Sequence, residues 1–171
     1  MKNFSNKKPI LDLFNFFEGN IIAYGIFEDR FGKLRRQFRV NIQGTVSNNI
    51  LRLDEKFIYD DGEKDSRIWT IKKQQLSNNI TKYSGSAKDI EGLAKGKASG
   101  NALNWFYDIY LNIKGNKIKV RFNDWIYQQD ENVAINRAYV SKFGIEIGSV
   151  TLVFLRDKAA KALGPLNLKE W

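Results

Sequence analysis

The chain has no cysteine and no histidine among its 171 residues. The lack of cysteine excludes disulfides, thiol nucleophiles, iron–sulfur clusters and zinc sites built from thiolates. The lack of histidine excludes Ser-His-Asp and Cys-His triads and the catalytic zinc sites that use imidazole ligands. Any proton transfer would therefore depend on Asp, Glu, Lys or Tyr with a shifted pKa. We expect neither a metal ion nor a cofactor.

Long apolar runs are also missing, and only two prolines occur, Pro9 and Pro165. No stretch of about 18 apolar residues could span a membrane as a helix. The first nine residues are polar and lack the apolar segment of a secretory signal, so the chain as written is expected in the cytoplasm. The length suits one domain over residues 1–171, with a core over 10–156 and a helical tail over 157–171.

The net charge is +9, from 28 basic and 19 acidic residues. Such a surplus favours acidic partners in general. Here, however, the basic residues are scattered along the chain and form no stripe interleaved with aromatic residues. We therefore expect no nucleic acid among the partners and interpret most of the charge as a lysine-rich surface.

Alternating apolar and polar residues dominate the chain between the two prolines, interrupted by short turns. This pattern predicts about nine or ten antiparallel strands, with short helical segments over 10–17 and 157–163. Loops are expected over 74–79 and 114–116. Glycines at positions 85, 92, 96 and 100 are typical of bends in a strongly coiled sheet. The fold class is therefore all-β, an antiparallel up-and-down barrel like that of lipocalins, which is able to hold one apolar ligand.

The first notable hairpin runs from Leu51 to Ile71. A three-residue loop over 60–62 with glycine at its end would pair Tyr59 with the residue at position 63. The same register sets Glu55 opposite Arg67 on the face that carries the apolar residues.

A second hairpin runs from Ile118 to Tyr139. A two-residue loop at Asp130 and the following residue would set Asp124 opposite Arg137, again on the apolar face. Ionised groups on a core-facing side of a strand are costly unless they are paired, so both predicted pairs need an explanation.

Two interpretations compete for these pairs. Arginine can receive a ligand carboxylate in two parallel hydrogen bonds, so the four residues could form the polar end of a ligand cavity. Alternatively, each pair neutralises itself and braces the wall. The aromatic residues on or near the same faces could line the cavity or simply pack the core, and the candidates are Trp69, Trp105, Tyr107 and Tyr139.

Several motifs along the chain carry a family resemblance: Phe17-Glu18-Gly19, Arg67-Ile68-Trp69, Asp124-Trp125-Ile126-Tyr127, Asn136-Arg137-Ala138 and Lys142-Phe143-Gly144-Ile145. Over residues 10–156 the chain resembles the bacterial domain of unknown function 3833, a family with no assigned activity. The resemblance implies a calycin-like barrel. Members often begin with a signal peptide and a lipidated cysteine, which this chain lacks, so a periplasmic or membrane-associated location is the alternative to the cytoplasm. The neighbourhood of family genes to fatty-acid-modifying enzymes implies a lipid ligand.

The leading hypothesis is a barrel that binds a lipid or fatty-acid-like amphiphile, with Glu55, Arg67, Asp124 and Arg137 at its polar end. Peripheral contact with a membrane is a further expectation, through the aromatic segment at 10–17 if that segment does not plug the barrel. The first alternative is an enzyme that isomerises or cyclises a lipid with Glu55 or Asp124 as base. The second is a structural or assembly partner with a filled core. A cavity of several hundred Å³ would separate the first two from the third.

Overall fold

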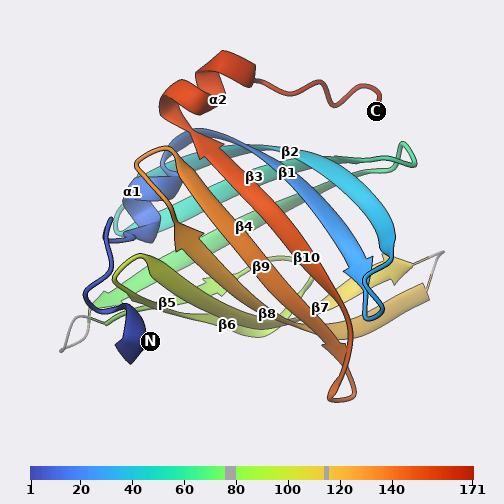
Figure 1. The fold of residues 1–171 in the computed structure, drawn as a ribbon, viewed down its shortest axis with the longest axis horizontal. Helices are drawn as coiled ribbons and strands as arrows, with labels where there is room; N and C mark the ends of the chain where they lie inside the picture. Colours follow the sequence, from blue (N-terminus) through green and yellow to red (C-terminus); the bar gives the residue numbers. More distant parts are fainter. Residues whose placement is uncertain (76–79, 114–115) are drawn as a thin grey trace.

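The structure is a computed structural model that describes residues 1–75, 80–113 and 116–171. In this part of the chain ten antiparallel strands form a closed barrel, in which sequence neighbours pair and β1 closes against β10 (Figure 1). The predicted all-β up-and-down barrel is therefore confirmed. The expected loop over 74–79 and turn over 114–116 fall largely outside the described residues. The strands are β1 (Gly19–Asp29), β2 (Leu34–Ser47), β3 (Ile50–Tyr59), β4 (Lys64–Gln75), β5 (Thr81–Ser86), β6 (Ile90–Ser99), β7 (Ala102–Ile113), β8 (Asn116–Gln128), β9 (Val133–Lys142) and β10 (Ile145–Arg156), and the helices are η1 (Lys2–Phe4), α1 (Leu13–Phe17) and α2 (Asp157–Leu163).

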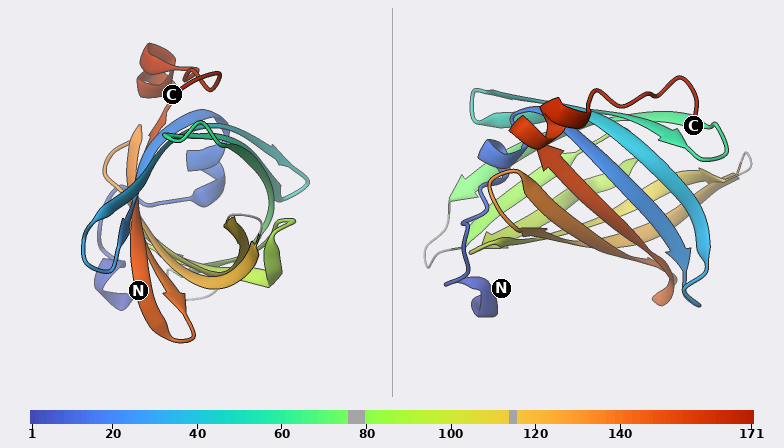
Figure 2. Two further views of the ribbon diagram at one scale, coloured as in Figure 1. Left: turned by 90° about the vertical axis from the view of Figure 1, so that its right-hand side faces the viewer. Right: turned by 45° about the horizontal axis from the view of Figure 1, so that its top comes forward.

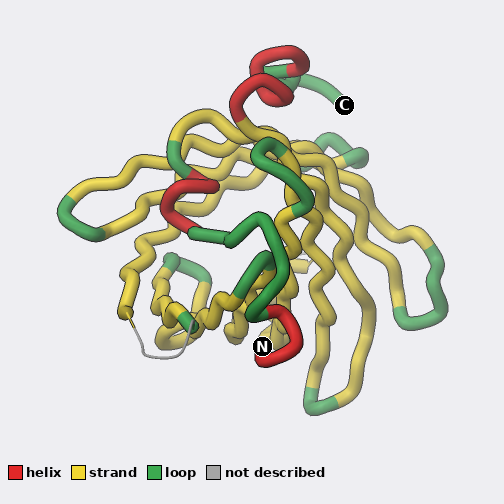
Figure 3. Tube along the Cα trace, turned by 60° about the vertical axis from the view of Figure 1, so that its left-hand side comes forward, coloured by secondary structure: helices red, strands yellow, loops and turns green. Residues whose placement is uncertain are grey.

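Helix α1 closes one end of the barrel. Asp12 caps the helix by accepting a hydrogen bond from the Phe14 amide, 3.0 Å away. Helix α1 lies within the ring of strands (Figure 2, left), where its side chains Phe16 and Phe17 are buried. Figure 3 shows the N-terminal segment crossing this end. Glycine at position 44 allows the approach, because a Cβ there would lie 1.5 Å from the Phe17 carbonyl oxygen. The aromatic segment is therefore a plug. Its apolar side chains are buried apart from Ile10, which is 63% exposed.

Both ends of the chain lie on the outer wall. The ring of Phe4 lies 5.9 Å from that of Trp125, so the N-terminal segment covers aromatic side chains of β8. After β10 the chain forms α2 and a short tail on the outside of the barrel (Figure 1). Leu166 of this tail packs with Ile22 of β1. The side chain of Asn41 holds this tail by bonding both the amide and the carbonyl group of Leu166, each at 2.9 Å.

The hairpin of β3 and β4 has the predicted register. Glu55 pairs with Arg67, and Leu53 and Trp69 face the same interior. The loop contains three residues, since the Tyr59 amide donates to the carbonyl oxygen of Glu63. This part of the sequence prediction is confirmed.

The predicted register of β8 and β9 is wrong by one residue. Asp124 pairs with Ala138, and Arg137 lies opposite Trp125 on the outer wall. The physical reason is the loop, which has three residues rather than two: the Asp130 carboxylate accepts hydrogen bonds from the amides of residues 132 and 133, at 2.7 and 2.9 Å. Because an odd loop length moves every side chain of β9 to the other face, Arg137 and Tyr139 point away from the interior.

Candidate ligand cavity

The barrel encloses a cavity of about 910 Å³. Helix α1 lines its closed end with Leu13 and Phe17, and the turns that follow β1, β3 and β9 surround the opposite end, which we call the mouth. Most lining side chains are apolar. A volume of this size is typical of small-molecule sites, so the interior is more than a packed core.

Aromatic side chains cover one side of the cavity. The Trp69 ring lies 5.7 Å from that of Trp105 and 5.4 Å from that of Tyr107, both edge-on, and Tyr107 stacks on Phe122 at 5.3 Å. The indole of Trp105 lies close against the backbone of the neighbouring strands, since a Cβ at Gly96 would come within 2.4 Å of it. These rings form a rigid apolar wall with few rotatable bonds.

A band of polar side chains interrupts the apolar lining on part of the wall at mid-depth. We call it the polar belt, and it consists of Glu55, Arg67, Tyr107, Asp124 and Asn136. Strands β3, β4, β7, β8 and β9 each contribute one member. The strand pattern places apolar residues on both sides of it, such as Leu53 toward the plug and Phe57 toward the mouth. A ligand that fills the cavity must therefore pass this level.

Arg67 makes its closest ion pair with a residue outside the belt. Its Nε and Nη2 donate to the carboxylate of Asp89 at 2.8–3.1 Å, whereas Nη1 lies 3.9 Å from Glu55 Oε2. Asp89 lies in the turn between β5 and β6, and this contact connects that turn to β4. The fork of Arg67 is thus already occupied on one side by a carboxylate of the protein itself.

Asp124 lies deepest in the wall among these acids, with 8% of its surface exposed. Its Oδ2 has no hydrogen-bond partner. The amide of Asn136 on β9 donates to the Trp125 carbonyl oxygen at 3.2 Å and also interacts with the Asp124 carboxyl group. A buried acceptor without a partner is unusual in folded proteins, and marks Asp124 as a candidate for contact with a bound molecule.

Burial raises the pKa of both belt carboxyls. For Glu55 burial outweighs the attraction of Arg67, and the charges of Asp89 and Asp124 add to the effect, so that its pKa rises to about 7. For Asp124 burial again dominates over interactions with Asn136, Tyr107 and Arg67, and the pKa rises to about 6. Near pH 7 the carboxyl group of Glu55 is therefore partly protonated, whereas that of Asp124 is mostly ionised.

The structure brings six of the eight predicted site residues to the cavity lining: Glu55, Arg67, Trp69, Trp105, Tyr107 and Asp124. Arg137 and Tyr139 lie outside; Arg137 donates to Thr151 Oγ1 at 2.6 Å, and Tyr139 is 41% exposed.

Sequence reasoning missed two functional candidates. The inward position of Asn136 could have been predicted if Asp130 had been interpreted as the capping residue of a three-residue loop. A loop of that length turns Asn136 toward the interior. Asp89 has no local signal, because it reaches Arg67 from the turn that follows the next strand, 22 residues along the chain.

The mouth has a different charge pattern from the belt. Arg36 stacks on Tyr59, with its guanidinium carbon 3.6 Å from the ring centroid, and pairs with Asp61 at 2.9 Å. Lys64 and Lys142 also line the cavity here, and neither makes an ion pair with another described residue. Asp65 lines the cavity at the same level and also makes no ion pair with another described residue, so these three side chains leave one positive charge at the mouth that is not offset.

Within the described residues, no group of three or more acidic side chains has an arrangement that could hold a metal ion. Likewise, none of the helices in this part of the chain is long and apolar enough to cross a membrane.

Comparison with known proteins identifies the family. The family model described as "Protein of unknown function (DUF3833)" matches residues 1–156. The chain belongs to the DUF3833 family. Curated protein sequences give no match. Among solved structures, the S-type phycobiliprotein lyase CPES from Guillardia theta superposes with a TM-score of 0.57 at 11% identity, covering 85% of this chain and 90% of that one. At 11% identity, this similarity between the lyase and the present chain concerns the fold alone.

Proposed function

We propose that the protein binds a lipid or fatty-acid-like amphiphile inside the barrel. The observation that carries this proposal is the 910 Å³ cavity, which is largely apolar, plugged at one end by α1 and open at the other. A filled core, as expected for a purely structural partner, would leave no such volume. Antiparallel barrels of this size are suited to hold one small ligand.

The charges favour one orientation of the ligand. The two lysines at the mouth, Lys64 and Lys142, outnumber the neighbouring Asp65 and can attract an acidic head group. Arg67 at mid-depth is already engaged by Asp89. The hydrocarbon part would then extend past the belt toward Trp69, Trp105 and the plug. This orientation replaces the arginine fork that the sequence suggested as the carboxylate site.

The test is native mass spectrometry of gently purified protein, followed by organic extraction. We expect a stoichiometric amphiphile, either co-purified or captured from a cell lipid extract. Val140→Trp should abolish capture because position 140 faces the cavity, and Tyr139→Trp is the matched control on the outer face of the same strand. Circular dichroism checks that both variants fold. An unliganded mass under all conditions would favour the assembly role instead.

A peripheral membrane contact is supported at the mouth rather than at α1. Phe31 and Phe143 lie at the tips of the β1–β2 and β9–β10 hairpins and are 80% and 93% exposed. A cation lies beside each ring: Arg30 at 4.7 Å and Lys142 at 5.4 Å. Aromatic side chains with adjacent cations suit an anionic bilayer surface. Such a contact would favour a membrane-associated location over a cytoplasmic one.

Vesicle co-sedimentation tests this contact. The double variant Phe31→Ser/Phe143→Ser should lose binding to vesicles of phosphatidylcholine and phosphatidylglycerol, whereas Leu163→Ser, an exposed apolar residue of α2, should not. Equal binding of all three proteins would contradict the contact.

An enzyme on the same barrel is the second candidate, and the raised pKa of Glu55, about 7, favours it. A carboxylate that titrates near neutrality is suited to act as a general base on a bound lipid. Glu55→Gln should then retain ligand capture but stop any conversion of the extracted lipid, measured by mass and retention time. Identical product profiles for both proteins would count against catalysis.

A further inference from the structure

The charge balance at mid-depth limits what a ligand can present there. Arg67 is the one cationic member of the belt, and Asp89 binds its Nε and Nη2. Glu55 and Asp124 face the same cavity without a cation of their own. Three carboxyl groups thus share one guanidinium, so a ligand carboxylate at this level would meet like charge.

Asp124 carries a buried hydrogen-bond acceptor, Oδ2, that receives no hydrogen bond. It is 8% exposed, it lines the cavity, and its Oδ2 has no hydrogen-bond partner. The terminal torsion of aspartate is broad, so a small rotation can turn either oxygen toward a bound molecule. Asn136 and Tyr107 both interact with the Asp124 carboxyl group, and the Asn136 amide also donates to the Trp125 carbonyl group, but neither residue makes a hydrogen bond to Oδ2.

We propose that the polar belt binds a hydrogen-bond donor, an N–H or O–H group carried part-way along an otherwise apolar ligand, and that Asp124 accepts this bond. The inference rests on the proposed function, because it assigns a role to one level of the same cavity. A hydroxylated acyl chain, a secondary amide and a pyrrole-type ring all have the required chemistry. Apolar walls on both sides of the belt then hold the remainder of the molecule.

The experiment compares two nearly isosteric probes, carbazole and fluorene, which differ by an N–H in place of a CH₂ group. Both are fluorescent, so affinities can be measured by direct titration of the full-length protein. Wild-type protein should bind carbazole about 10-fold more tightly than fluorene, the ratio expected for one hydrogen bond to a buried carboxyl group.

Two variants locate the acceptor. Asp124→Val removes it and should bring the carbazole-to-fluorene ratio close to one, whereas Asp124→Asn keeps an acceptor oxygen and should keep the preference. If Asp124→Val does not fold, the carbonyl ¹³C shift of Asp124 in the wild-type protein gives a second readout, and it should move with carbazole and not with fluorene.

Equal affinities of the wild-type protein for both probes would overturn the inference and leave the binding barrel intact. A preference that survives Asp124→Val would also overturn it, by placing the donor elsewhere. If neither probe binds and no amphiphile is captured by mass spectrometry, the proposed function itself fails. The two failures are therefore distinguishable.

Discussion

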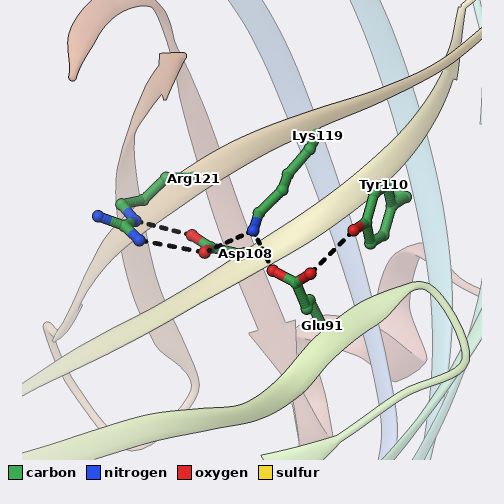
Figure 4. Close-up of polar contacts among 5 residues, drawn as sticks. All are labelled: Glu91, Asp108, Tyr110, Lys119 and Arg121. Carbon is green, nitrogen blue, oxygen red and sulfur yellow. Dashed lines mark hydrogen bonds and ion pairs between the residues drawn. The ribbon is translucent and has the colours of Figure 1, made fainter. Parts of the chain in front are cut away.

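The polar belt inside the barrel and an ion network on its outer wall use the same residue types with opposite results. The outer network joins Glu91, Asp108, Tyr110, Lys119 and Arg121 across β6, β7 and β8 (Figure 4). Arg121 Nε binds Asp108 at 2.7 Å, and Lys119 contacts both acids. Two acids and two bases balance each other there. Hydrogen bonds from Arg121 and Lys119 lower the pKa values of Asp108 and Glu91.

Inside the barrel, three carboxyl groups share one guanidinium, and burial raises the pKa values of Glu55 and Asp124. The comparison teaches that residue type alone does not decide what a carboxyl group does in this fold. Access to water and the balance of nearby charges decide whether it forms a stable ion pair or remains able to bind a ligand. A balanced ion pair on the surface contributes little, whereas an unbalanced buried group is sensitive to every change around it.

Removal of the central cation should have the largest effect. Arg67→Met leaves Glu55 and Asp89 without a partner, and we expect a loss of about 3 kcal/mol in the free energy of unfolding at pH 7. Arg121→Met is the matched change in the outer network and should be barely measurable by urea denaturation. Losses of similar size in the two variants would break the distinction between inside and outside.

The pH dependence of stability should be of similar size and should differ in sign between the two regions. The folded pKa of Glu55, about 7, is above the usual 4.5, so the native state holds a proton that the unfolded state loses. Relative to Glu55→Gln, the wild-type protein should therefore lose stability as the pH rises from about 4.5 to 7, by about 3 kcal/mol. Urea unfolding at a series of pH values measures this.

Asp108→Asn supplies the opposite case. The pKa of Asp108 is lowered in the folded protein. The ionised carboxylate therefore stabilises the fold above its usual pKa, and this stabilisation is lost as the pH falls through the folded pKa. The stability difference between wild type and Asp108→Asn should therefore shrink in acid. A common sign for Glu55→Gln and Asp108→Asn would contradict our assignment of the two environments.

The smallest effect is expected from Arg137. Its guanidinium lies on the outer wall, 3.6 Å from Glu28 and 40% exposed at the side chain. Arg137→Ala should cost about 0.5 kcal/mol and leave ligand capture unchanged. Loss of the bound amphiphile in this variant would restore the inward register that the sequence suggested and that the structure rejects.

The fold could be read from the sequence because alternation and turn chemistry agree over most of the chain. Glu55 and Arg67 were placed together because the loop at 60–62 has a glycine that fixes its length. The register of β9 could not be read from alternation alone. Small residues such as Ala138 occupy its inner face while larger apolar side chains lie outside, so hydrophobicity pointed to the wrong face.

The ion pair between Arg67 and Asp89 could not be predicted from the sequence for another reason. It depends on how far a short β5 lets the β5–β6 turn approach β4, which is a property of the closed barrel and not of any local pattern. The interpretation of the arginine changed with it, from a fork for a ligand carboxylate to a group already engaged by the protein.

The most direct test of this account is a carboxyl ¹³C NMR titration of the purified protein, with Glu55 and Asp108 followed in the same spectra. We predict a midpoint near pH 7 for Glu55 and one below the usual 3.8 for Asp108. Midpoints near 4 for both groups would show that the interior carboxyl group is as well solvated or neutralised as the surface one, and would contradict the acid-rich cavity on which the account depends.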